Sequence, residues 1–409
     1  MDNFGALRLR KGRNTNLRIG ATILSFFLCC ASLHAQQVEI VVTNPSSAAR
    51  TNEPVVIPWS SVHGKFDTAA PSLSLTDDGG KAIPVQIDDL NFDGKEDELT
   101  FVANFDPEQM RKFTLLPDVR SKEFPARTEA RNYKRVDGVL RSIDDDDVPG
   151  TGRERKAYRF DGVGWESEVV GYRLYLDERN ATDIQGKRIP GLYWNWIGES
   201  GVDYQLDAFW GMDVLHVGPA LGIGGIGFWI GDSVKKPLVL DRQRCRIVAR
   251  GPVRAVVRNS YFGWDLGGEK VDVTSQFSIY AGDRISEHKV ILDRSSSART
   301  LVTGIVKHDS TKIVWNAKQG YLFTLGHQSR ANDTLFMALV VDPSKVKRKS
   351  SDQYNELLLL NIERGKPISI LLTSYWQGET GRMWSQAEIE EFLESTVRRM
   401  AEPMVIEIH

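Results

Sequence analysis

The stretch RCRIVARGPVRAVVRNSYFGW, residues 244–264, decides the fold class of this chain. Polar and β-branched residues alternate along it, and Gly251 with Pro252 interrupts the pattern near its middle, as between two short strands. A similar segment, KVDVTSQFSIYA (270–281), follows after another short break. Strands that follow one another at this spacing predict an antiparallel β-sheet.

Segments of the same kind occur along the whole chain. The other predicted strands are VEIVVTN (38–44), EPVVIPW (53–59), SLSLTDD (72–78), FTLLPD (113–118), SEVVGYRLYLD (167–177), SEHKVILD (286–293), YLFTLG (321–326), TLFMALVVD (334–342) and ISILLTSYW (368–376). One long helix is predicted at 385–400, because Ser385 can cap it and arginines end it, as the helix dipole favours.

The N-terminus predicts an exported protein. Basic residues precede the apolar run IGATILSFFLCCASLHA (19–35), which is the pattern of a secretory signal peptide. The run is too short for a membrane span, which needs about 20 apolar residues. We therefore expect a periplasmic or secreted protein without a membrane span. Its mature chain retains Cys245 alone, which is expected to be a buried packing residue.

The fold prediction is mostly β, in two domains. The charged segment KEFPARTEARNYKR (122–135) is interpreted as a linker between them. We predict a signal peptide at 1–35, a small N-terminal β-sandwich at 36–125, and a large antiparallel β domain at 126–409. The large domain ends in the α-helix and carries the candidate active site.

Residues 222–227, GIGGIG, match the dinucleotide-binding pattern G-x-G-x-x-G. That motif requires a strand before it and a helix after it. Here Gly231 and Pro237 leave no room for a full helix. We interpret the run as a tight glycine-rich loop and expect no nucleotide. Net charge −2, with 41% hydrophobic and 26% charged residues, also excludes a basic nucleic-acid-binding protein and a disordered chain.

Residues 89–98, DLNFDGKEDE, resemble a calcium-binding loop. Oxygen ligands at alternate positions around a glycine are what Ca²⁺ requires, and the candidate ligands are Asp89, Asn91, Asp93 and Asp97. The usual carboxylate at the twelfth position is missing, because residue 100 is threonine. The alternative is an Asx-rich hairpin turn. Either role is structural.

The densest group of aromatic and polar residues lies between 165 and 216. Tryptophans beside carboxylates suit sugars, whose C–H faces stack on indole rings. The candidate substrate-binding residues here are Trp194, Trp196, Asp207, Trp210 and Asp213. Trp194 and Trp196 alternate on one predicted strand face and fit either a core or a ligand platform. Glu166, Glu168 and Tyr172 are predicted on one side of another strand, with Arg173 on the other.

Two histidines are candidate proton carriers. His216 lies between apolar neighbours just before the glycine run, and is either a general base or a neutral buried histidine. Lys307 and His308 combine a charge for an anionic group with a second proton carrier. The chain has no H-x-H or H-E-x-x-H spacing and no G-x-S-x-G elbow, so no metal or other cofactor is expected in catalysis.

Several segments resemble the exported bacterial family described as domain of unknown function 4861. They include WESEVVGYRLYLD, WGMDVLHVGPALGIGG, GPVRAVVRNSYFGW, GGEKVDVTSQFSIYAGDR, GIVKH and the loop VPVQIDDLNFDGKEDELTF. The resemblance covers nearly the whole mature chain. It implies a β-sandwich followed by a galactose-mutarotase-like β-supersandwich, and an association with gene clusters for polysaccharide breakdown. Some members are associated with dehydration of terminal uronic acids in oligosaccharides.

The resemblance implies β-elimination on a uronic-acid-containing oligosaccharide. Arg173 or Lys307 would neutralise the carboxylate, His308 or His216 would take the C5 proton, and Tyr172 or Glu168 would protonate the leaving group. The family pattern has lysine where His216 stands, which favours Lys307 and His308.

Two alternatives remain open. A glycoside hydrolase needs two carboxylates about 5–10 Å apart, for which Glu168 with Asp207 or Asp213 is the best pair. A non-catalytic glycan-binding protein would use Trp194, Trp196 and Trp210.

Overall fold

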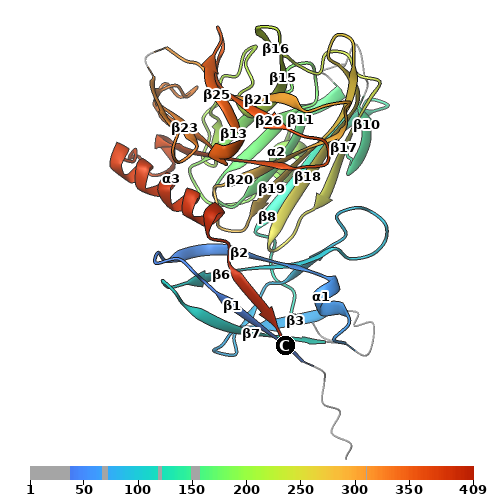
Figure 1. Ribbon diagram of the computed structural model, residues 1–409, viewed down its shortest axis with the longest axis vertical. Coiled ribbons are helices and arrows are strands. Elements are labelled where there is room, and N and C mark those ends of the chain that lie inside the picture. The colour runs from blue at the N-terminus through green and yellow to red at the C-terminus, as the bar shows by residue number, and fades with distance from the viewer. Residues whose placement is uncertain (1–36, 67–71, 118–121, 149–156, 310) are drawn as a thin grey trace, which may run out of the picture. The chain divides into compact units, whose positions relative to one another are not determined.

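The computed structural model describes residues 37–66, 72–117, 122–148, 157–309 and 311–409. The predicted signal peptide therefore lies outside the described residues. The chain is mostly β, with several antiparallel sheets and a C-terminal helix, which confirms the predicted fold class (Figure 1). Within the described part of the chain, no helix is long and apolar enough to cross a membrane.

The first sheets form a small sandwich. A five-stranded sheet contains, in order, β28 (Val405–Ile408), β1 (Val38–Thr43), β7 (Met110–Pro117), β3 (Leu73–Thr76) and β4 (Ala82–Ile83). A three-stranded sheet contains β2 (Arg50–Pro58), β6 (Glu98–Phe105) and β5 (Gln86–Asp88), and the short helix α1 spans Ser60–His63. Phe101 and Phe113, 4.7 Å apart between ring centroids, join the two sheets in one core.

The last strand of the chain belongs to this first sandwich. β28 pairs antiparallel with β1, with Ile408 opposite Ile40. The sequence placed residues 126–409 together in the large domain, but 405–408 complete the first sheet instead. A strand of only four residues, alternating between exposed and half-buried positions, gives little sign of which sheet it joins.

Three further sheets make up the large β region. The nine-stranded sheet contains, in order, β10 (Asp145–Val148), β17 (Arg242–Ala249), β18 (Arg254–Asp265), β19 (Lys270–Tyr280), β20 (Ser286–Arg294), β27 (Ile368–Trp376), β24 (Thr334–Val341), β23 (Tyr321–His327) and β22 (Lys312–Asn316). The segment quoted first forms β17 and β18, which pair antiparallel with Cys245 opposite Asn259. Cys245 is buried and unpaired, as expected.

The other two sheets carry the elements around the candidate site. One contains β14 (Gly211–Asp213), β13 (Thr182–Lys187), β12 (Gly171–Tyr175), β11 (Tyr158–Ser167), β8 (Thr128–Val136) and β9 (Val139–Ser142). The other contains β16 (Ser233–Lys235), β15 (Ile223–Ile230), β21 (Arg299–Val306), β26 (Asn355–Ile362) and β25 (Val346–Ser351). One apolar core joins all three large sheets, through residues such as Tyr172, Phe228 and Phe277.

The C-terminal helix forms as predicted. α3 spans Gln386–Ala401, and the Ser385 side chain accepts a hydrogen bond from the Glu388 backbone N–H. The Glu388 carboxylate accepts in return from the Ser385 N–H at 2.7 Å, which completes a capping box. The apolar side of α3, with Ile389 and Leu393, packs on β23 and β24. Two short 3₁₀ helices are also present: η2 (Pro343–Lys345) follows β24, and η3 (Gln377–Glu379) follows β27.

Three local predictions were wrong. Residues 128–135 of the predicted linker belong to strand β8, which pairs with β11 and β9 in the six-stranded sheet. Glu166 and Tyr172 lie on different strands, β11 and β12, because the chain turns between them. Trp194 and Trp196 lie on a short helix, α2 (Trp194–Ser200), and not on a strand. The buried Glu166 carboxylate accepts from the Tyr193 and Trp194 N–H groups, at 2.6 and 2.7 Å, and so starts that helix.

All of the glycine run after Gly222 lies in a strand and not in a loop. It belongs to β15, which pairs with β21 through a bulge, and the strand continues where a dinucleotide motif would begin a helix. Gly222 has φ 69°, and a Cβ there would lie 1.9 Å from the carbonyl oxygen of Thr182. Only glycine permits this contact, which holds the segment before β15 against β13.

Candidate active site

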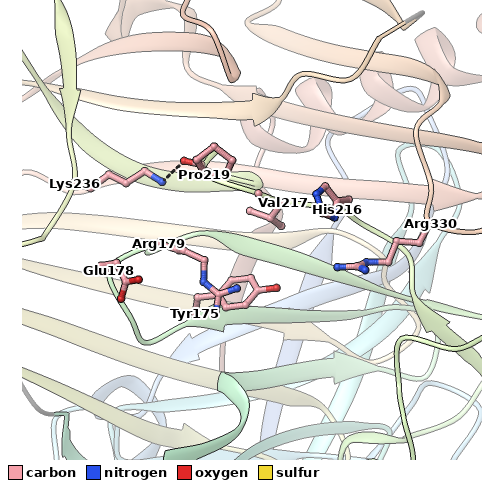
Figure 2. Close-up of a pocket in the computed structure, with 9 residues that line it drawn as sticks. Tyr175, Glu178, Arg179, His216, Val217, Pro219, Lys236 and Arg330 are labelled. Atoms are coloured by element: carbon pink, nitrogen blue, oxygen red, sulfur yellow. Dashed lines mark hydrogen bonds between the residues drawn. The ribbon is translucent and has the colours of Figure 1, made fainter. Parts of the chain in front are cut away.

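A pocket of about 520 Å³ lies where four connections meet. Its wall is made by the β12–β13 connection, the β14–β15 connection, the residue after β16 and the β23–β24 connection (Figure 2). The lining residues are Tyr175, Glu178, Arg179, His216, Val217, Gly218, Pro219, Lys236 and Arg330. Bridges between Thr182 and Gly222, and between Leu215 and Ser329, hold these connections together. The volume suits a small ligand of one or two sugar rings.

One wall of the pocket is the buried Tyr175, at the end of β12. Guanidinium groups lie over its ring, with Arg173 at 4.4 Å and Arg179 at 3.6 Å from the ring centroid. Its hydroxyl donates to Asp183 Oδ2 at 2.7 Å and accepts from Arg173 at 2.5 Å. Burial, together with the charge of Asp183, raises the pKa of Tyr175, so that its phenol stays protonated at neutral pH.

Behind Tyr175 lies a fully buried charge network. Arg173 pairs with Asp183 and, at 3.0 Å, with Asp213, and it also donates to the Tyr204 hydroxyl at 3.0 Å. Burial and the charge of Asp183 raise the pKa of Asp213 to about 7. Arg173 and Asp213 are only 1% and 0% exposed, so a ligand in the pocket cannot reach them directly. They support the pocket from beneath.

The pocket is rich in positive charge. Arg179 is held by Asp161, at 2.9 Å, and by Asp177. Lys236 donates to the carbonyl oxygens of Pro219, at 2.7 Å, and Ala220, at 2.8 Å, and burial lowers its pKa to about 8 (Figure 2). The charges of Asp352 and Asp177 partly oppose this lowering of the pKa of Lys236. A lysine of this kind suits an anionic ligand.

Arg330 enters the pocket from the opposite side to Lys236 (Figure 2). Its Nε donates to the carbonyl oxygen of Leu215 at 3.2 Å and lies 3.6 Å from Asp213 Oδ1. The guanidinium has no shorter ion pair in the described part of the chain. Its remaining donors are therefore available to a carboxylate.

The structure brings both candidate histidines to this place. His216 is exposed and lines the pocket. His308 follows β21, is half-buried, and lies close enough to His216 for the two imidazoles to interact. Burial, together with this neighbour, lowers the pKa of His308, so its ring is neutral at pH 7. Its Nε2 is buried and has no hydrogen-bond partner among the described residues.

The other candidates for the chemistry lie elsewhere. Tyr172 is in the core, where its hydroxyl donates to the Arg284 carbonyl oxygen at 2.8 Å. Glu168 accepts from Arg127 at 2.6 Å and from the Gly282 N–H at 2.8 Å. Lys307 is exposed, donates to the Asp352 carbonyl oxygen at 3.2 Å, and does not line the pocket.

The tryptophans divide between core and surface. Trp194 and Trp210 are fully buried in a cluster around Phe160 on the outer side of the six-stranded sheet. Trp196 is 38% exposed and contacts Phe209 edge to face at 5.7 Å. Asp207 forms a surface ion pair with Arg188 at 2.8 Å. None of these residues lines the pocket.

The calcium-like loop has the hydrogen bonds of an Asx-rich turn. Asp97 accepts from the N–H groups of Leu90 and Asn91, at 2.7 and 3.0 Å, and Asp89 accepts from Phe92 and Gly94. Asn91 and Asp93 each accept from the backbone two residues later. No group of three or more His, Cys, Asp or Glu in the described residues comes together as a metal site. These oxygens serve the backbone in this structure.

Sequence reasoning missed most of the pocket wall. Tyr175 alternates with Arg173 on β12 and was detectable as its neighbour on the same face. Arg179, Lys236 and Arg330 lie in connections, where no periodic pattern points to them.

The chain is similar to known proteins that include one curated relative and two solved structures. "Uncharacterized protein P7" from Formosa agariphila is 21% identical over 417 residues, which cover 94% of this chain and 96% of the relative. A protein in glycosyl hydrolase family 38 from Enterococcus faecalis has a TM-score of 0.49 at 10% identity, covering 92% of this chain and 48% of its own. An α-mannosidase from Enterococcus faecalis has a TM-score of 0.46 at 10% identity, covering 91% and 46%. The chain spans about half the length of these solved structures.

The family model described as "Domain of unknown function (DUF4861)" matches residues 42–406, from β1 to β28. This match includes every element that lines the pocket. The resemblance noted in the sequence is confirmed, and the chain belongs to this family.

Proposed function

We propose that this chain is a carbohydrate-active enzyme that acts on uronic-acid-containing oligosaccharides by β-elimination, as a dehydratase or a lyase. The observation that carries the proposal is the meeting of His216, with His308 beside it, and the cations Lys236 and Arg330 at one pocket. A proton acceptor next to positive charge is what removal of a proton α to a carboxylate requires.

The reaction assigns roles to Arg330, His216 and His308. Arg330 pairs with the uronate carboxylate and stabilises the negative charge that develops when the C5–H bond breaks. His216, which lines the pocket, takes that proton. The electron pair forms the C4=C5 double bond, and the C4–O bond breaks. His308 stays neutral beside His216 and adds no competing positive charge.

The leaving oxygen needs a proton, and the imidazolium formed at His216 supplies it. Tyr172 and Glu168, the acids expected from the sequence, are held by Arg284 and Arg127 away from the pocket. If the oxygen belongs to a hydroxyl, water leaves and the enzyme is a dehydratase. If it belongs to a glycosidic bond, the enzyme is a lyase.

The alternatives have less support. A hydrolase needs two accessible carboxylates, but Asp213 is fully buried and Glu168 is tied to Arg127. A non-catalytic glycan-binding surface would use exposed aromatic side chains, of which Trp196 and Phe209 are the available pair.

The test is incubation of the protein with a panel of uronic-acid oligosaccharides, followed by ultraviolet absorbance and mass spectrometry. A rise in absorbance from a conjugated, unsaturated uronate supports elimination. Loss of one water identifies a dehydratase, and chain cleavage identifies a lyase. Shorter products without the absorbance change would overturn the proposal in favour of hydrolysis, and an unchanged panel would favour the binding protein. Export to the periplasm or medium remains a further part of the proposal, tested by N-terminal sequencing of the secreted chain.

A further inference from the structure

Asp213 and Arg330 connect the buried charges with the pocket. Asp213 lies on β14 without exposed surface, and its Oδ2 accepts from Arg173 at 3.0 Å. Its other oxygen, Oδ1, lies 3.6 Å from the Nε of Arg330, which lines the pocket. Asp213 is thus shared between one guanidinium that is buried and one that a ligand can reach.

The charges in this place balance only when Arg330 is included. Arg173 by itself faces two buried carboxylates, Asp183 and Asp213. Two carboxylates with one guanidinium leave an uncompensated negative charge in the interior, which is costly. Arg330 supplies the second positive charge from the pocket side.

We propose that binding of an anionic ligand at Arg330 is coupled to the uptake of a proton by Asp213. A ligand carboxylate that takes the Arg330 guanidinium leaves Asp213 with Arg173 alone, which it shares with Asp183. A proton from solvent then adds to the Asp213 carboxylate and restores the balance, and no other bond changes. The inference rests on the proposed function only for the presence of an anionic ligand in this pocket.

The environment of Asp213 allows its carboxylate to bind this proton near neutral pH. Burial and Asp183 already raise the pKa of Asp213 to about 7, against the opposing charges of Arg173 and Arg330. Withdrawal of Arg330 removes one of those opposing charges and raises the pKa further.

Other groups around Asp213 are also accounted for. The neutral hydroxyls of Tyr175, from β12, and of Tyr204, from the connection before β14, face the network, and both phenols stay protonated because burial raises their pKa values. His216 lines the pocket, His308 lies beside it, and the histidine variants described below measure any proton that they contribute. The coupling predicts that affinity for an anion falls as pH rises through about 7, because proton uptake becomes unfavourable.

The first test is calorimetry of D-glucuronate binding, at pH near the Asp213 pKa, in buffers of different ionisation enthalpy. The wild-type protein is expected to take up as much as about one proton per ligand. Asp213→Asn should lose this uptake, whereas a His216→Gln/His308→Gln double variant should retain it. The matched control is Asp145→Asn, which changes an exposed carboxylate paired with Arg244 at 2.6 Å. Uptake that persists in Asp213→Asn and vanishes in the histidine variant would overturn the inference.

A second test needs no ligand and separates this inference from the proposed function. Arg330→Met removes the guanidinium as a ligand would, at a half-buried position. The infrared band of a protonated carboxyl should then be stronger at neutral pH than in wild type, and this increase should be absent when Arg330→Met is combined with Asp213→Asn. If Arg330→Met gives no increase over wild type, the coupling is wrong. If the increase occurs although D-glucuronate does not bind, the coupling stands and the uronate function fails.

Discussion

The Arg179 guanidinium lies 3.6 Å from the centroid of the Tyr175 ring, and both side chains face the pocket. Asp177 and Asp161 hold the guanidinium in that place, so its position does not depend on a ligand. The ring and the charge together form a preformed wall for a sugar.

Arg179→Met should weaken substrate binding more than it slows the chemical step. The loss of the cation–π contact and of the ordered wall is expected to cost ~0.5–2 kcal/mol in binding. Steady-state kinetics on a uronic-acid oligosaccharide would show this as a raised KM with kcat little changed. A variant with unchanged KM and a much lower kcat would instead place Arg179 in the chemistry.

His216→Gln should reduce elimination by roughly 10²–10⁴-fold, since it removes the group that accepts the proton. His308→Gln should have a smaller effect, because His308 neighbours the pocket but does not line it. Initial rates of product formation measure both. The exposed His409, at the far C-terminus, provides a control substitution that should leave the rate unchanged. Equal rates for His216→Gln and the control would contradict the assigned base.

Asp213 should impose a pH dependence on folding stability. Its pKa is raised from 3.8 to about 7, so its protonated form is the one that favours the folded state. This stabilisation is fully present below the pKa that Asp213 has in the unfolded chain, 3.8, and it is lost as pH rises through its pKa in the folded protein, about 7. Urea denaturation from acidic to neutral pH should therefore show wild type losing stability relative to Asp213→Asn. A constant difference between the two proteins would mean that Asp213 does not titrate in this range.

Trp194 and Trp196 should behave differently despite their proximity in sequence. Trp194 is fully buried, and Trp194→Ala should destabilise the fold by about 3–5 kcal/mol. Trp196 is 38% exposed, so Trp196→Ala should cost about 1 kcal/mol or less and leave catalysis intact. Thermal melts and activity on the same samples measure this. Loss of glycan affinity in Trp196→Ala with a normal melt would revive the binding-surface alternative.

The loop at 89–98 should be stabilised by its own hydrogen bonds. Asp97→Ala removes the acceptor for two backbone N–H groups and one side-chain amide, at an expected cost of about 1–2 kcal/mol. Melts of wild type with calcium and with a chelator should coincide. A calcium-dependent rise in Tm that disappears in Asp97→Ala would identify the loop as a cation site instead.

The sequence predicted the fold class because strand periodicity and capping are local. The alternation in 244–264 produced β17 and β18, and the Ser385 cap produced the start of α3. The local sequence pattern gave wrong secondary structure where tertiary contacts determine it. β8 resembles a linker because most of its residues are polar or charged, although Thr128 and Asn132 are buried. α2 resembles a strand because the carboxylate that starts it, Glu166, comes from another element.

The candidate site was only partly predictable for the same reason. His216 and His308 were identified by their chemistry, although they lie far apart in the sequence. Lys236 and Arg330 were missed because single basic residues in loops are common, and only the fold brings them to the pocket. Arg173 and Asp213 were expected to bind substrate, but the structure buries them in a pair with each other.

Proton NMR of a uronic-acid oligosaccharide during incubation with the wild-type protein decides whether elimination occurs. If His216 removes the C5 proton, the C5–H signal of the reacting uronate declines while a vinylic C4 proton signal grows in step with it. New reducing-end signals with the C5–H signal intact would show hydrolysis and contradict the proposed reaction. A spectrum with line broadening alone would show a protein that binds the glycan without changing it.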